Sequence, residues 1–185
     1  GPDTVAAFIA EPIHGGGGVL YPTDDYFPLV RQVCDRHQVL FIADEVQSGF
    51  GRTGKMFAIE AHDVEPDILC MAKGIASGFP FAALGMRRSI DDAWQVGSQG
   101  GSSNGNPIGC AAALATIDVL TSPGFLDNVH ARGNQLIDAL REMQQLDQEL
   151  RYVRGRGLMV ATEFESEERP AAIVKHCLSE HGVIL

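Results

Sequence analysis

The feature that most constrains the fold is an alternation of short apolar runs with a segment of helical periodicity. Residues 5–10 and 39–43 are continuous apolar runs of strand length, rich in β-branched and aromatic side chains. Between them, apolar residues recur at helical spacing over residues 26–37, after a Pro-Thr-Asp-Asp segment that offers capping oxygens. Because continuous apolar runs are typical of parallel strands buried on both faces, this part of the chain is predicted to be a βαβ unit.

The following residues extend this pattern. Residues 68–72 and 81–86 are predicted strands, joined by a Gly/Ser/Pro loop short enough for the second to run antiparallel. Asn106 and Pro107 provide a favourable start for a helix to about residue 120, and residues 125–146 predict a longer helix. Residues 152–164 predict two strands around an Arg-Gly-Arg-Gly turn, followed by a helix near residues 171–180.

The expected fold class is α/β, with a mostly parallel sheet that contains one antiparallel strand. We predict part of a large cofactor-binding domain over residues 1–121 and an interdomain helix over 122–147. Residues 148–185 are predicted to form part of a small α+β domain.

Charge and cysteine usage narrow the class of function. The formal net charge of −10 would repel nucleic acid and anionic membrane surfaces, so neither is an expected partner. The four cysteines lack the close spacing of a zinc site or a small disulfide framework, which predicts reduced thiols, no metal site and a cytoplasmic location. The sequence also has neither an apolar run of bilayer length nor the pattern of a signal peptide.

Three ionisable residues follow predicted strands. Glu11, Asp44 and Lys73 each stand at or just past a strand's carboxyl end, which is the edge where open α/β sheets bind ligands. A lysine can hold pyridoxal phosphate (PLP) as a Schiff base, and a carboxylate can keep its pyridine nitrogen protonated. The pair Asp44 and Lys73 therefore predicts a PLP enzyme. Taken singly, a strand-end Asp is more often a helix cap, and a lone Lys is more often solvated.

Longer motifs carry a resemblance to a known family. Residues 40–54 (LFIADEVQSGFGRTG), the Pro-Asp-Ile before the third strand and the Ala-Lys-Gly after it closely resemble class III PLP-dependent aminotransferases of fold type I. The resemblance implies that Asp44 pairs with the pyridine nitrogen, Val46 packs on the ring and Gln47 lies near the ring hydroxyl. It also implies that Lys73 forms the Schiff base and that Ser102, in place of the usual Thr, binds the cofactor phosphate of a neighbouring subunit.

The match extends to Glu11-Pro12, for which the resemblance implies a substrate contact, and to the Arg-Gly-Arg-Gly turn. It implies the central part of the fold type I large domain and a homodimer with shared active sites. It also implies that the chain is a fragment without the family's N-terminal half and C-terminal end. Ornithine and 4-aminobutyrate aminotransferases carry a second Glu after their Glu-Pro pair, where this sequence has Gly16. That Glu helps them to accept 2-oxoglutarate, so pyruvate or glyoxylate are the expected acceptors here.

The predicted function of the parent protein is transfer of an amino group from an ω-amino acid or amine, such as 4-aminobutyrate, to a 2-oxo acid. A same-fold aminomutase, racemase or decarboxylase stays open, because the bond held perpendicular to the cofactor ring decides the reaction. The isolated piece is expected to be inactive. The alternative hypothesis is a non-enzymatic function, in which the chain serves only as a structural or interaction module.

Overall fold

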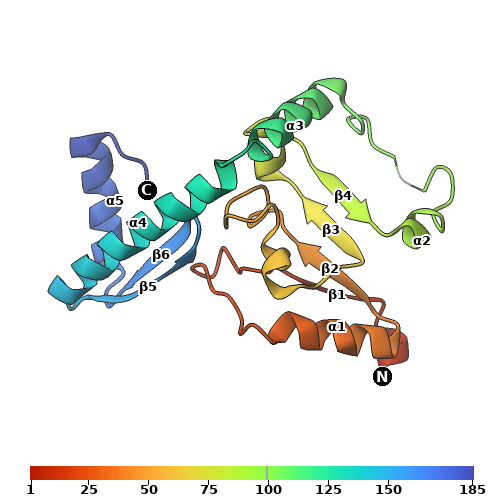
Figure 1. The fold of residues 1–185 in the computed structure, drawn as a ribbon, viewed down its shortest axis with the longest axis horizontal. Helices are drawn as coiled ribbons and strands as arrows, with labels where there is room; N and C mark the ends of the chain where they lie inside the picture. The colour runs from red at the N-terminus through yellow and green to blue at the C-terminus, as the bar shows by residue number, and fades with distance from the viewer. Residues whose placement is uncertain (99) are drawn as a thin grey trace.

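The computed structural model describes residues 1–98 and 100–185, and its larger sheet has the strand order β1-β2-β3-β4 (Figure 1). These strands span Ala7–Ala10, Leu40–Asp44, Ile68–Met71 and Ala83–Met86. The pairs β1–β2 and β2–β3 are parallel, whereas β3–β4 is antiparallel. The predicted α/β class, with one antiparallel strand in a mostly parallel sheet, is therefore confirmed.

One face of this sheet carries a hydrophobic core that β2 shares with helix α1 (Tyr26–His37). Side chains alternate along a strand, so Phe41 and Ala43 of β2 point to the same face, where both are fully buried. Helix α1 covers them, and its Phe27 ring stacks on Phe41 with centroids 5.7 Å apart. The short 3-10 helix η2 (Ala58–His62) adds Ile59 to the same cluster. The opposite face is open: Ile9 of β1 is 58% exposed.

A buried carboxylate ties the elements around this core together. The Asp67 side chain accepts hydrogen bonds from the Phe41 amide and the Arg31 guanidinium, both at 2.7 Å, and pairs with Arg87 at 3.1 Å. Burial acts to raise the pKa of Asp67, but the Phe41 amide and the two arginines outweigh it and lower that pKa overall. Asp67 thus joins α1, β2 and the segment after β4 to the start of β3.

Two long helices lead from the larger sheet to a second sheet. Asn106 accepts hydrogen bonds from the amides of Ile108 and Gly109, at 2.9 and 3.3 Å, and so caps α3 (Pro107–Leu120). Helix α4 (Phe125–Leu146) follows after a 72° bend. The strands β5 (Leu150–Arg156) and β6 (Met159–Phe164) pair antiparallel, and α5 (Glu168–His181) lies beyond them.

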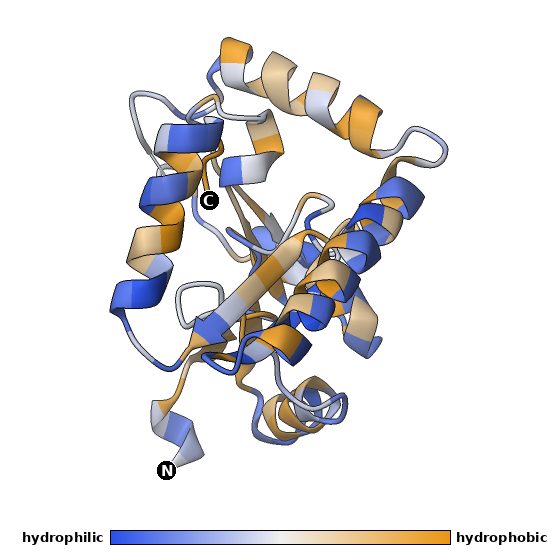
Figure 2. Ribbon diagram, turned by 90° about the vertical axis from the view of Figure 1, so that its left-hand side faces the viewer, coloured by the Kyte–Doolittle hydropathy of each residue, from blue (hydrophilic) through white to orange (hydrophobic). Residues whose placement is uncertain are grey.

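Helix α3 is apolar around most of its circumference, as its colour shows in Figure 2, where it is the uppermost helix. Ile108 and Leu114 are 66% and 64% exposed. Within the described residues, no helix alone is long and apolar enough to cross a membrane. Helices α3 and α4 taken together meet that criterion by length and composition only, and they are bent relative to each other.

The two sheets meet at a contact between backbones. Gly157, in the β5–β6 turn, lies against the backbone of Thr53, and a Cβ on it would come within 2.5 Å of that residue's carbonyl carbon. A Cβ on Gly133 of α4 would come within 2.2 Å of the Gly157 carbonyl oxygen. The Leu158 amide donates to the Arg52 carbonyl at 2.9 Å. Glycine at positions 133 and 157 is thus what allows this close approach.

The predicted elements are present, with shifted ends. Strand β1 begins at Ala7 rather than residue 5, and β4 begins at Ala83 rather than residue 81. Helix α5 starts at Glu168, before the predicted residue 171. The short helices η1 (Pro2–Thr4), η2, η3 (Lys73–Ala76) and α2 (Arg88–Asp91) were not predicted. The division at residues 121 and 147 stays a prediction.

Candidate active site

Asp44 is the last residue of β2 and lies at the carboxyl edge of the larger sheet. Its carboxylate accepts a hydrogen bond from the Val46 amide at 3.1 Å, which closes a turn directly after the strand. Parallel pairing places Asp44 opposite Cys70 on β3. Since neighbouring strands lie about 4.8 Å apart, residues just past Cys70 share this edge with Asp44.

Lys73 follows Cys70 by one short turn and begins η3. Its φ of 47° lies in the left-handed region, which costs a non-glycine residue about 1 kcal/mol or more. Such strain is concentrated at functional sites. The Lys73 side chain is exposed, and its Nζ donates to Oε1 of Gln47 at 3.2 Å. The predicted lysine and the predicted glutamine are therefore in contact.

Gln47 is held against the glycine-rich loop that follows β1. A Cβ on Gly15 would come within 2.4 Å of the Gln47 amide group, so the missing side chain makes room for that amide. The Gly15 amide in turn donates to Glu11 at 3.1 Å, and the other Glu11 oxygen lies 3.6 Å from the His14 ring. In this chain the Glu11 carboxylate thus organises its own loop beside Gln47, and its predicted substrate contact stays a prediction.

Val46 faces a large open hollow beside the ends of β3 and β4. The hollow has a volume of about 1020 Å³ and is also lined by Ala72 and by residues 103–106 of the turn before α3. Ligand sites occupy roughly 300 to 1,000 Å³, so the space is large enough for a ligand, but Asp44, Gln47 and Lys73 are not among the residues that line it. Ser102 lies on the exposed turn next to this lining, and its expected contact with a neighbouring subunit stays a prediction.

Glu45, which sequence reasoning left without a role, is fully buried beside Asp44. Its carboxylate accepts hydrogen bonds from the Ser48 hydroxyl and from the Ile59 amide, the latter at 2.7 Å. Burial raises the pKa of Glu45, and these hydrogen bonds offset only part of that rise. The sequence held no signal that separates Glu45 from Asp44, because both are carboxylates at the end of the same apolar run.

Two arginines of β5 contact the segment that follows β1. Arg154 donates to the Gly18 carbonyl at 2.7 Å and pairs with Glu163 at 2.8 Å. Arg156 approaches Asp24 at 3.3 Å. The Arg-Gly-Arg-Gly turn was recognised in the sequence, but its contact with the loop after β1 depends on tertiary folding.

The donor set suits PLP. A primary amine, a carboxylate and an amide stand at one edge of adjoining strands, and the Gly15 position leaves the space that the amide occupies. Lys73 would hold the cofactor's aldehyde carbon, Asp44 its ring nitrogen and Gln47 its ring hydroxyl. The fold and this site together define a class of enzymes that work through a covalently held cofactor.

Comparison with known proteins identifies the family. The profile described as "Aminotransferase class-III" matches residues 1–185. A 4-aminobutyrate aminotransferase of Mycobacterium leprae is 41% identical over 100% of this chain and 43% of its own length. An acetylornithine aminotransferase of Caldanaerobacter subterraneus is 38% identical over 94% of this chain and 44% of its own length.

A solved ornithine aminotransferase of Toxoplasma gondii superposes with a TM-score of 0.92. It is 36% identical, and the match covers 100% of this chain and 43% of that protein. Its description mentions partial occupancy of PLP at the active site. The chain belongs to the class III aminotransferases, a PLP-dependent family, and spans less than half the length of these relatives.

Proposed function

We propose that the full-length protein containing this chain is a PLP-dependent aminotransferase. In this proposal it moves the amino group of an ω-amino acid or amine, such as 4-aminobutyrate, to a 2-oxo acid. The contact between Lys73 Nζ and Gln47 at the edge that Asp44 shares is the observation that carries the proposal. The relatives described above are aminotransferases, which favours transamination over a mutase, racemase or decarboxylase.

The chain's own residues supply attachment, charge and proton transfer. When bound, PLP supplies an electron sink for the bond broken at the substrate's amine-bearing carbon. Asp44 provides a negative charge at the strand edge, and each pKa unit by which it stabilises a protonated ring nitrogen is worth about 1.4 kcal/mol. Lys73 would hold the cofactor at rest and, once released, carry a proton on its Nζ. Gln47 orients that amine by accepting its hydrogen bond.

Further residues complete the proposed site. Val46 would pack on the cofactor ring, Ser102 would bind the phosphate of a neighbouring subunit, and Glu11 would contact substrate. We propose a homodimer with shared sites, and the exposed apolar side chains of α3, such as Ile108 and Leu114, support such an interface. Gly16 supports pyruvate or glyoxylate as the acceptor.

Borohydride trapping tests the attachment site directly. The full-length protein with added PLP should show the visible absorbance of a Schiff base. After borohydride reduction, the peptide that contains Lys73 should carry the added mass of the cofactor. Lys73→Ala should lose both signals. Added cofactor mass on the peptide that contains Lys55 or Lys175 would show that the attachment site is assigned wrongly.

The acceptor is tested separately by initial rates with 4-aminobutyrate and each of three 2-oxo acids. Pyruvate or glyoxylate should be used faster than 2-oxoglutarate. A strong preference for 2-oxoglutarate would contradict the inference from Gly16 and leave the proposed role of Lys73 untouched.

A further inference from the structure

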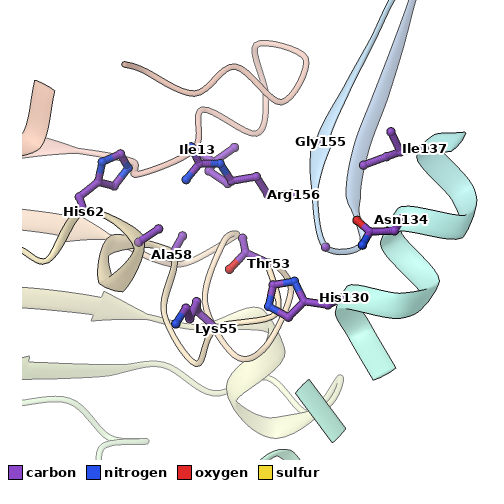
Figure 3. A pocket seen from close by; sticks show the side chains of 12 residues that line it. Ile13, Thr53, Lys55, Ala58, His62, His130, Asn134, Ile137, Gly155 and Arg156 are labelled. Carbon is purple, nitrogen blue, oxygen red and sulfur yellow. The ribbon is translucent and has the colours of Figure 1, made fainter. Parts of the chain in front are cut away.

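A second cavity lies where the loop after β2 meets α4 and β5, and Figure 3 shows the side chains that line it. Its volume is about 290 Å³, and it shares no lining residue with the hollow beside Val46. Lys55 comes from the loop, His130 and Asn134 from α4, and Arg156 from β5. Segments distant in sequence thus converge on one partly open cavity.

The cavity contains an unpaired buried hydroxyl. Thr53 lines the cavity and is 5% exposed, and its Oγ1 is buried without a hydrogen-bond partner among the described residues. Folded proteins rarely leave such a group unpaired, because burial removes the water that would otherwise satisfy it. Because almost none of this oxygen's surface is accessible, the hydroxyl belongs to the cavity wall and lies out of reach of a ligand in the cavity.

The other polar groups of the cavity favour a negative ligand. Lys55 carries a positive charge, His62 and His130 present ring nitrogens, and Asn134 presents an amide. Among the described residues, no Asp or Glu lines the cavity, although the chain's net charge is −10. The cavity lining therefore has a local excess of positive charge and hydrogen-bond donors.

Arg156 adds a second positive charge at the rim. Its guanidinium lies 5.0 Å above the Tyr21 ring and 3.3 Å from Asp24, whose side chain is 91% exposed. A carboxylate so exposed is well screened and neutralises little of the charge inside the cavity. The Arg156 side chain is therefore held in place while it stays available to a ligand.

The remaining lining is apolar. Ile13 and Ala58 are 2% and 3% exposed, and Ala61 and Ile137 complete this side of the wall. A hydrated inorganic ion would gain nothing from this surface, whereas a carbon chain would bury apolar area there.

We propose that this cavity binds a small organic anion. Its carboxylate or phosphate group would contact Lys55, His130 and Asn134, and its carbon portion would lie against Ile13 and Ala58. The proposal is independent of the transamination proposed above, because none of these residues belongs to the strand-edge site.

Calorimetric titration of the full-length, PLP-loaded protein tests the proposal with succinate and glycerol 3-phosphate as probes. At least one should bind, and their ratio of affinities identifies the preferred head group. Lys55→Gln should weaken binding about 10-fold, since a charged hydrogen bond is lost.

Lys175→Gln on α5 is the matched control and should leave the affinity unchanged, because Lys175 does not line the cavity. Lys55 is exposed, so its replacement preserves the core. No binding of either probe at about 10 mM, or binding that Lys55→Gln leaves unaltered, would overturn the proposal. Inorganic phosphate or chloride binding as tightly as the organic probes would overturn it as well.

Discussion

Two adjacent carboxylates at the end of β2 have different surroundings. Asp44 is half-buried and reaches the strand edge, whereas Glu45 is fully buried and accepts hydrogen bonds from Ser48 and Ile59. One of the two is therefore free to act on a ligand, and the other holds the loop that carries Gln47.

The raised pKa of Glu45 makes a prediction about stability. Because the folded state holds this proton more tightly, the contribution of Glu45 to stability falls as pH rises above its unfolded value of about 4.3. The fall continues until the folded pKa is passed. Relative to Glu45→Gln, the wild type should lose at most about 1.4 kcal/mol per pH unit in this window.

Urea unfolding between about pH 4 and pH 8 measures this difference. The exposed Glu65→Gln serves as the control for the loss of one carboxyl group. A wild-type stability that rises relative to Glu45→Gln across the window would show that the carboxylate is favoured in the fold.

For single residues, the sequence predicted the candidate reactive side chains better than it predicted the contacts that hold them in place. Asp44 and Lys73 could be placed because parallel strands bring their carboxyl ends to one edge. The contact of Gly15 with Gln47 and the burial of Thr53 could not be predicted, because both depend on how loops distant in sequence pack together.

Among the contacts between elements, Asp67 connects α1, β2 and the segment after β4 through Arg31, Phe41 and Arg87. Asp67→Asn should lower the free energy of unfolding by about 2 to 3 kcal/mol at neutral pH, since it leaves the largely buried Arg31 with only its exposed partner, Asp35. The lowered pKa of Asp67 means that its contribution is present above its unfolded value of about 3.9. The contribution is lost as pH falls through the lower, folded value.

Chemical denaturation of Asp67→Asn and of Asp35→Asn separates this effect from a general charge effect. Asp35 also pairs with Arg31, but its side chain is 63% exposed, so its loss should cost less than about 0.5 kcal/mol. Equal losses for the two variants would contradict the role given to Asp67.

The glycine contact between α4 and the β5–β6 turn yields another prediction at this scale. Gly133→Ala should gain about 1 kcal/mol of helix propensity, yet its Cβ would clash with the Gly157 backbone. The net result should be a loss of about 1 to 3 kcal/mol. Thermal unfolding measures it, with the exposed Asn128→Ala on the same helix expected to be neutral or stabilising. A stabilised Gly133→Ala would mean that the two sheets are not packed this closely.

The regular elements were predictable because each has a sequence signal of its own: a hydrophobic periodicity, a helix-capping residue or a residue that ends the element. Asn106 and Pro107 give such a signal for the start of α3. The 3-10 helices η2 and η3 were not, because each is a single turn fixed by tertiary contacts. Residues 81 and 82 read as strand from their apolar character, but β4 begins only at Ala83.

The whole molecule exposes apolar surface on two sides. Ile9 and Leu84 of the larger sheet are 58% and 53% exposed, and α3 presents Ile108 and Leu114. Parallel sheets are normally covered on both faces. The isolated 185-residue chain should therefore bind a dye such as ANS more strongly, per molecule, than the full-length protein does. Equal fluorescence would show that the full-length protein leaves these faces uncovered.

The contact between the larger sheet and the β5–β6 hairpin is made largely by main-chain atoms. Arg154 reaches the Gly18 carbonyl, and the Leu158 amide reaches the Arg52 carbonyl. Peptide groups are the same in every homologue, so this contact depends on few side chains, of which Arg154 is one. Gene shuffling between relatives with a crossover in residues 100–105 is therefore expected to yield folded chimeras, provided that the parent of the C-terminal part keeps Arg154 and glycine at positions 133 and 157.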